Sequence, residues 1–127
     1  MGTLDVERLP GVAVVVLRGE QEAYTAPRLA HELRALLDER VAVVVDLSNT
    51  VFLESAILLE LLRAKDAAAE AGVGFVLQLA SETAPYLQRV FEAAALTSAF
   101  ATAPTLRAAI SAARAGVVAP DVGAEPA

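Results

Sequence analysis

The chain has 127 residues, no cysteine, a single histidine and a formal net charge of −6, and its mean hydropathy is +0.52. This length fits one domain with a core of its own. The absence of cysteine excludes disulfides, and the acidic balance argues against unspecific binding to nucleic acid or an anionic membrane face.

The apolar runs are as long as strands, and far shorter than the roughly 20 residues of a membrane-spanning helix. The first residues lack the basic and apolar stretches of a signal peptide. We therefore expect a cytoplasmic protein that does not insert into a membrane. The lone His31 cannot form a metal site by itself, and no nucleophile motif or phosphate-binding glycine loop is present, so we expect no enzyme activity, metal or cofactor.

The first third of the chain predicts two strands and a helix. Val12–Leu17 is a continuous β-prone run, and Leu4–Leu9 is expected to pair with it as an edge strand across a Pro-Gly turn. The polar stretch Gly19–Tyr24 is interpreted as a loop. The helix that follows is indicated by an N-cap candidate, a proline in the first turn and leucines at helical spacing: Thr25, Pro27, Leu29, Leu33, Leu36 and Leu37.

The middle of the chain predicts a buried strand, a loop and a long helix. Val41–Leu47 has contiguous apolar residues, a pattern typical of a strand covered on both faces. Ser48–Thr50 is interpreted as a loop. The helix is expected to open at Glu54 and Ser55 and to end at Gly72.

The last third predicts two more strands and two more helices, over Gly74–Leu79, Pro85–Ala95, Ala99–Ala101 and Pro104–Ala115 in chain order. The alternation predicts a single α/β domain over residues 1–115, with a mixed sheet of about four to five strands and about four helices. Residues 116–127 contain proline, glycine and acidic residues without periodicity, so we expect a disordered tail. Sites in such sheets lie beyond the carboxyl ends of strands, which favours the two predicted loops, Gly19–Tyr24 and Ser48–Glu54.

Three stretches of the chain carry a resemblance to a known family. Asp46–Ser55 reads Asp-Leu-Ser-Asn-Thr-Val-Phe-Leu-Glu-Ser. It resembles without a gap the signature Asp-Leu-Ser-Gly-Val-x-Phe-Ile/Leu-Asp-Ser-Ser-Gly-Leu of the STAS domain family, the anti-sigma factor antagonists and their relatives. Gly19–Glu22, followed by Thr25–Pro27, resembles the family's Gly-Glu-Leu-Asp loop and first helix. Leu96–Phe100 resembles its closing segment. The resemblance covers about residues 4–115 and implies a STAS-like fold.

The resemblance also implies a function. In antagonists of this type, a serine kinase that is itself the anti-sigma factor phosphorylates the first serine of Asp-Ser-Ser-Gly, and the phosphorylated antagonist lets go of it. Ser55 occupies that position here. Around Ser55 the chain departs from the pattern, with Glu54 for the aspartate, Ala56 for the second serine and Ile57 for the glycine that follows it. A β-branched isoleucine does not permit the close backbone approach that glycine does.

The expected partner surface comprises the two loops and the first turns of the helix after Ser55. The residues expected to contact a partner are Glu20, Glu22, Tyr24, Thr25, Asn49, Thr50, Glu54, Ser55, Ile57 and Leu59. Because the helix starts with consecutive apolar residues, Leu58, Leu61 and Leu62 can share its buried stripe while Ile57 and Leu59 are expected to be exposed.

Alternatives remain for each part of this surface. Glu54 or Ser55 can simply cap its helix, and Glu22 can contact a basic partner or assist phosphoryl transfer by the kinase. The apolar residues can instead be buried under a neighbouring helix or form a self-association contact, such as a weak homodimer. In the same family, STAS domains serve as scaffold or accessory subunits of stress-sensing and lipid-transport complexes, so a permanent, unphosphorylated interface is the competing hypothesis.

Overall fold

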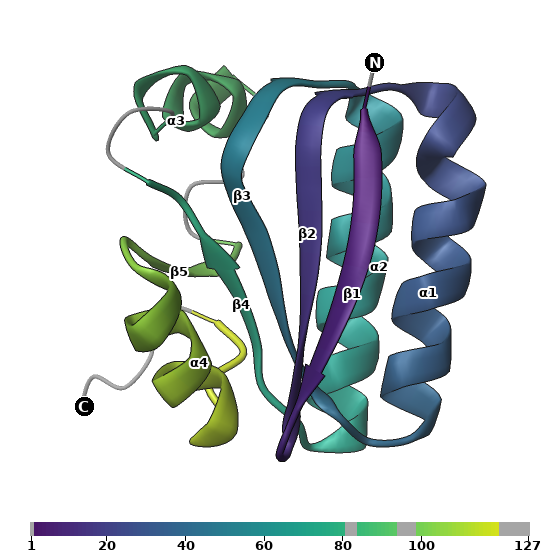
Figure 1. Ribbon diagram of the computed structural model, residues 1–127, viewed down its shortest axis with the longest axis vertical. Helices are drawn as coiled ribbons and strands as arrows, with labels where there is room; N and C mark the ends of the chain where they lie inside the picture. Colours follow the sequence, from purple (N-terminus) through teal and green to yellow (C-terminus); the bar gives the residue numbers. More distant parts are fainter. Residues whose placement is uncertain (1, 81–83, 94–98, 120–127) are drawn as a thin grey trace.

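The computed structural model describes residues 2–80, 84–93 and 99–119, and in them the chain forms one mixed sheet with helices on both faces (Figure 1). The strands stand side by side in chain order. They are β1 (Thr3–Leu9), β2 (Val12–Gln21), β3 (Ala42–Leu53), β4 (Phe75–Gln78) and β5 (Ala101–Ala103). The helices are α1 (Ala26–Asp38), α2 (Ser55–Ala71), α3 (Ala84–Ala93) and α4 (Leu106–Arg114), and the short 3₁₀ turn η1 (Ala23–Thr25) precedes α1. The predicted α/β class and element order are confirmed.

The sheet combines one antiparallel pair with three parallel pairs. β1 and β2 form the predicted hairpin, whose turn contains Gly11 at φ 76°, a conformation that glycine adopts without steric cost. β2, β3, β4 and β5 run parallel to one another because a helix connects each strand to the next. Gly72, at φ 74°, ends α2 as expected.

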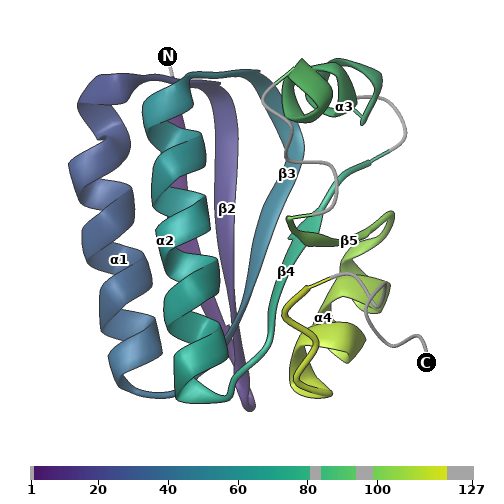
Figure 2. The same cartoon turned by 180° about the vertical axis from the view of Figure 1, so that it is seen from behind.

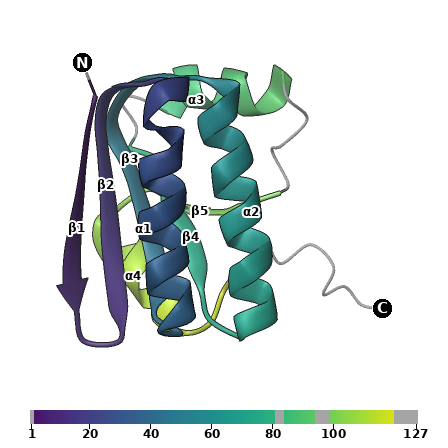
Figure 3. The same cartoon turned by 90° about the vertical axis from the view of Figure 1, so that its right-hand side faces the viewer.

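Two apolar clusters lie on opposite faces of the sheet. α1 and α2 cover one face (Figures 2 and 3), where alternate residues of β3 such as Val43, Val45 and Leu47 pack against their leucines. α4 lies on the other face, where Val44 packs in a cluster that includes Ala109. Because both faces are covered, the strand reads as an unbroken apolar run in the sequence.

Both expected loops belong in part to the ends of strands. β2 continues to Gln21 and β3 to Leu53, and the two remain paired, with Gly19 opposite Thr50 and Gln21 opposite Leu53. Two register shifts interrupt this part of the pairing. The polar stretches that suggested loops therefore belong to an irregular extension of the sheet.

The carboxyl-terminal third differs from the prediction in its boundaries. β5 begins two residues later than expected, and Phe100 is buried before it. Val117 accepts a backbone hydrogen bond from Phe75 at 2.9 Å and Val118 packs against the core, so the ordered chain passes the expected boundary at residue 115. The predicted closing segment at 96–98, the end of the predicted helix at 94–95 and the tail from 120 lie outside the described residues.

Candidate functional site

The candidate site lies at the end of the sheet where β2 and β3 finish. From there the chain enters η1 and α1 after β2, and α2 after β3, so these five elements meet at one end of the molecule (Figures 1 and 3). The expected contact residues all come from these elements. The sequence therefore predicted which segments the fold brings together, although it did not predict which of their side chains face outward.

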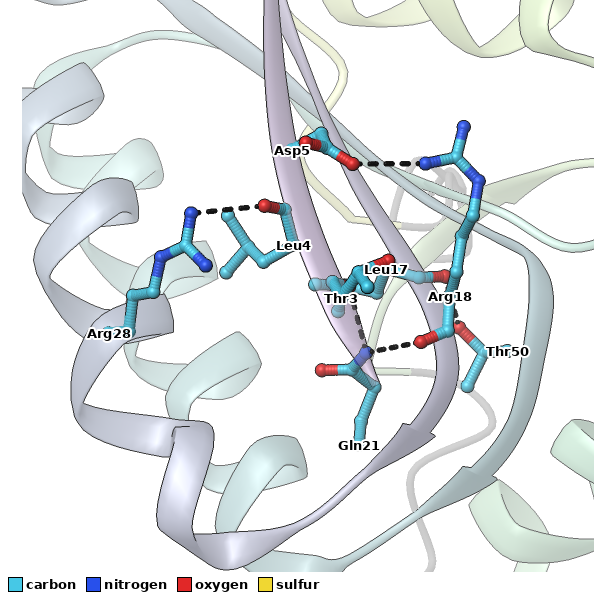
Figure 4. Close-up of polar contacts among 8 residues, drawn as sticks. All are labelled: Thr3, Leu4, Asp5, Leu17, Arg18, Gln21, Arg28 and Thr50. Carbon is cyan, nitrogen blue, oxygen red and sulfur yellow. Dashed lines mark hydrogen bonds and ion pairs between the residues drawn. The ribbon is translucent and has the colours of Figure 1, made fainter. Parts of the chain in front are cut away.

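Two buried polar side chains support this end of the sheet from inside (Figure 4). The Thr50 hydroxyl donates to the Leu17 carbonyl oxygen at 2.7 Å, and Thr50 is 0% exposed. The Gln21 side-chain amide donates to the carbonyl oxygens of Thr3 at 3.1 Å and Arg18 at 2.9 Å. Thr50 was expected to contact a partner, and its burial corrects that expectation. Gln21 was overlooked, although a glutamine that continues a buried strand is a sign of internal hydrogen bonding.

Further contacts fasten the outer strand beside the site (Figure 4). Arg28 of α1 donates through Nη2 to the Leu4 carbonyl oxygen at 3.1 Å. On the strand pair itself, Arg18 Nη1 lies 3.1 Å from Asp5 Oδ2 in an exposed ion pair. These contacts connect β1 to β2 and to α1, and they stabilise the edge of the sheet beside the site.

Ser55 is the first residue of α2 and its side chain is exposed. The predicted start of this helix is confirmed. The Ser55 hydroxyl is accessible to a modifying enzyme, and a phosphate there would add about −1.5 to −2 charges.

Glu54 occupies the N-cap position of α2 but uses its carboxylate elsewhere. Its Oε1 accepts a hydrogen bond from the Ala23 amide at 2.6 Å, and its own amide donates to the Gln21 carbonyl oxygen at 3.0 Å. Within the described chain, no side chain caps α2. Thr25 precedes α1 as expected, but its hydroxyl donates to the Glu22 carbonyl oxygen at 2.8 Å instead of capping the helix. Glu54 and Thr25 therefore occupy the N-cap positions of α2 and α1, but neither side chain caps its helix.

Ile57 and Leu59 have opposite environments. Ile57 is 0% exposed and Leu59 is 45% exposed. Two residues apart on a helix lie about 200° apart around its axis, so the two side chains point in nearly opposite directions. The expectation that Ile57 is exposed is wrong, while the exposure expected for Leu59 is confirmed.

Four large apolar side chains are exposed at this end. Tyr24 in η1 is 68% exposed, Val51 and Phe52 near the end of β3 are 57% and 39% exposed, and Leu59 follows in α2. Val51 and Phe52 were not expected in the site. The run Val51–Leu53 gave no signal of exposure, because the same unbroken apolar pattern marks the part of β3 that is buried on both faces.

The polar residues of the site are acidic or neutral. Glu20, Glu22 and Asn49 stand beside the apolar residues along β2 and β3, with Asn49 exposed and the two glutamates half-buried. Hydrogen bonding to its carboxylate lowers the pKa of Glu20 below its ordinary value. We call the following set the carboxyl-end surface: Glu20, Glu22, Tyr24, Asn49, Val51, Phe52, Ser55 and Leu59.

The described residues form no cluster of side chains that could bind a metal ion. Within residues 2–80, 84–93 and 99–119, no three side chains of His, Cys, Asp or Glu come together in a way that would hold a metal ion. Among the same residues, no helix is long and apolar enough to cross a membrane.

Comparison with known proteins identifies the family. The family model described as the STAS domain matches residues 3–109. The crystal structure of an anti-sigma factor antagonist from Mycobacterium paratuberculosis is 30% identical, with a TM-score of 0.76 over 90% of this chain and 95% of that one. A putative anti-sigma factor antagonist from Thermotoga maritima is 16% identical, with a TM-score of 0.74 over 87% and 94% of the two chains.

The anti-sigma factor antagonist SpoIIAA in its unphosphorylated form is 15% identical, with a TM-score of 0.61 over 71% of this chain and 82% of that one. No match was found among curated proteins. The model match covers most of the chain, and the fold agrees with it from the β1–β2 hairpin to α4. The chain therefore belongs to the STAS domain family.

Proposed function

We propose that this chain is an anti-sigma factor antagonist, a non-enzymatic bacterial regulator of transcription that binds an anti-sigma factor through the carboxyl-end surface. The observation that carries the proposal is an exposed Ser55, at the position of the family's modified serine, on the same end of the molecule as four exposed apolar side chains. Aromatic residues such as Tyr24 are enriched among the few residues that carry most of the binding energy in protein interfaces. The 30% identity to the mycobacterial antagonist supports the same role.

The partner is proposed to be an anti-sigma factor with serine kinase activity, and Ser55 its substrate. Phosphorylation would place about −1.5 to −2 charges among the carboxylates of Glu20 and Glu22. A partner surface that complements Glu20 and Glu22 accommodates these two carboxylates in both states. The phosphate adds bulk and charge that would have to be desolvated in the contact, and this cost weakens binding. Release then follows from a change in the surface and needs no refolding.

The scaffold alternative is weakened, because one of the two residues on which it depends is buried. It relied on Ile57 and Leu59 as a permanent apolar interface, and Ile57 is buried within the domain. Size-exclusion chromatography with light scattering distinguishes the two roles, because a regulator that must release is expected as a monomer or weak dimer. A stable high-order assembly of the isolated chain would favour the scaffold.

The decisive experiment is pairwise titration calorimetry against each serine-kinase-type anti-sigma factor encoded in the same genome. We expect one of them to bind the wild type, and Ser55→Asp to bind at least about tenfold more weakly than the neutral control Ser55→Asn. Tyr24→Ala is expected to weaken binding as well, whereas Leu106→Ala, an exposed residue on α4, leaves it unchanged. Equal affinity of Ser55→Asp and Ser55→Asn would contradict the switch.

Incubation of the complex with ATP tests the modification directly. We expect a mass increase of about 80 Da, for one phosphoryl group, that peptide mapping assigns to Ser55 and that is absent from Ser55→Asn. Modification at another residue would remove Ser55 from the proposal while leaving the binding result intact.

A further inference from the structure

The turn that carries Tyr24 is tied to the start of α2 at two points, and both ties involve Glu54. The Glu54 amide donates to the Gln21 carbonyl oxygen at 3.0 Å, at the end of β2. The Glu54 carboxylate accepts from the Ala23 amide at 2.6 Å, at the start of η1. Inside the turn, Thr25 donates twice to the Glu22 carbonyl oxygen, through its amide at 3.0 Å and its hydroxyl at 2.8 Å. Glu54 thus ties the start of a short, internally bonded turn at two points.

We propose that Glu54 is a positioning residue, whose carboxylate holds the Tyr24 turn in place and loosens this hold when negative charge is added at Ser55. What the turn presents to a partner rests on the proposed function, whereas the tie itself is a property of the free protein. Glu54 is thereby moved from the expected list of partner contacts to an internal role.

The Glu54–Ala23 bond has the chemistry of a strong tie. It joins an ionisable carboxylate to a backbone amide, and charge-assisted hydrogen bonds are shorter and roughly twice as strong as neutral ones. Only two side-chain carbons separate the carboxylate from the backbone of Glu54, and that backbone is anchored by its bond to β2. The position of the Ala23 amide is therefore set by α2 and β2 together.

The length of the glutamate is essential to this tie. An aspartate is shorter by one methylene group, about 1.5 Å. From the same backbone position its carboxylate would stand roughly 4 Å from the Ala23 amide, too far for a hydrogen bond. Glu54 stands where the family has aspartate, and its longer side chain forms a bond to η1 that an aspartate on the same backbone would be too short to form.

Charge at Ser55 acts on this bond because Glu54 and Ser55 follow one another at the start of α2. A phosphate on Ser55 would raise the negative charge around the Glu54 carboxylate, and like charges repel each other. Glu54 can reduce the repulsion by turning its side chain away, which breaks its bond to Ala23. Tyr24, the next residue and the most exposed of the apolar side chains at this end, then loses its fixed position.

Amide hydrogen exchange of the free, full chain, measured residue by residue by NMR, tests the tie. We expect Ala23 to exchange at least about tenfold faster in Glu54→Ala and Glu54→Asp than in the wild type, because both variants lose the acceptor. Glu54→Gln retains an acceptor oxygen at the original length and is expected to show a smaller increase. The Leu61 amide in α2 serves as the internal control and is expected to keep its wild-type rate.

The charge coupling is measured in the same way with a matched pair. We expect Ser55→Asp to exchange Ala23 at least about threefold faster than the neutral Ser55→Asn, because only the former places a like charge beside Glu54. An unchanged Ala23 rate in Glu54→Ala would overturn the tie. An equal acceleration at Ala23 and Leu61 would reduce Glu54 to a contribution to global stability, and equal rates in Ser55→Asp and Ser55→Asn would overturn the coupling. Failure of the proposed function would appear separately, as absence of binding to every anti-sigma factor tested.

Discussion

The two halves of the β2–β3 pair use the same strands for different purposes. In the first half, Val12–Val16 lies opposite Ala42–Asp46 in unbroken register, and nearly every side chain is buried. In the second half, the pairing contains two register shifts, buries the polar Thr50 and Gln21, and exposes Val51 and Phe52. The regular half supplies the core, whereas the irregular half turns apolar side chains toward solvent.

The difference shows how a continuous strand becomes a site. Irregular pairing changes the direction in which side chains point and is over-represented next to functional sites. Such a stretch needs other means of holding its shape, and here these are the internal hydrogen bonds of Thr50, Gln21 and Glu54. Three predictions test this division between a core half and a site half.

The largest effect is expected from the same substitution made beside the core half and within the site half. Phe75 of β4 is buried opposite Val43 of the core half, so Phe75→Ala should lower the free energy of unfolding by about 3–5 kcal/mol through loss of burial and a residual cavity. Phe52→Ala in the site half should cost less than about 1.5 kcal/mol, because Phe52 is already partly exposed. Urea unfolding followed by circular dichroism measures both.

Phe75→Leu provides a milder variant should the alanine protein not fold. The comparison would fail if Phe52→Ala destabilised the protein as much as the substitution of Phe75. Such a result would mean that the site half is part of the core.

An intermediate effect is expected from the buried hydroxyl of the site half. Thr50→Val has nearly the same shape but lacks the bond to the Leu17 carbonyl oxygen, so we expect a loss of about 1–2 kcal/mol in unfolding free energy. The matched control is Thr102→Val on β5, where the threonine is exposed and a change within about 0.5 kcal/mol is expected. Equal stability of Thr50→Val and wild type would show that the hydroxyl does not support the irregular pairing.

The smallest effect is expected from an exposed ion pair at the opposite end of the sheet. Arg8 contacts the Glu39 carboxylate through two nitrogens, at 2.9 and 3.1 Å, and this hydrogen bonding lowers the pKa of Glu39. A lowered pKa in the folded state stabilises the protein above the ordinary pKa of glutamate, and this stabilisation is lost as the pH falls through the folded pKa.

Melting temperatures of wild type and Glu39→Gln should therefore differ slightly at pH 7 and converge in acid. Because the pair is exposed, high salt should also diminish the difference. A difference that persists unchanged at acidic pH and in high salt would rule out the ion pair as its source. If Glu39→Gln destabilised the protein as much as Thr50→Val, the ion pair would matter more than expected at an end of the sheet that we expect to be stabilised by its apolar core.

The sequence predicted the core half better than the site half, for a physical reason. Runs such as Val12–Leu17 and Val41–Leu47 are buried on both faces, so their composition alone identifies them as strands. Ser48–Thr50 resembled a loop because polar residues rarely continue a buried strand, yet Thr50 finds its hydrogen-bond partner on β2. Such a partner lies more than thirty residues away and leaves no local pattern.

The same limitation applies to the site residues. The signature ending at Ser55 predicted the start of α2 correctly, because it depends on chain order and on the start of a helix. The choice between Ile57 and Leu59 depends on the rotation of α2 about its axis, which is set by packing against the sheet and α1. The role of Glu54 depends on where β2 ends, and that end was expected several residues earlier.

The strand order of the sheet has a consequence for how the protein is made. Each strand pairs with its neighbour in the sequence, so a growing chain can add strands one after another to the initial β1–β2 hairpin. The hairpin closes over a short turn, whereas each parallel pair has to wait for a whole helix, since Val43 and its partner Phe75 lie more than thirty residues apart. The Phe75 amide donates to the Val117 carbonyl oxygen, so β4 gains this bond only after the last described strand and α4 have been made.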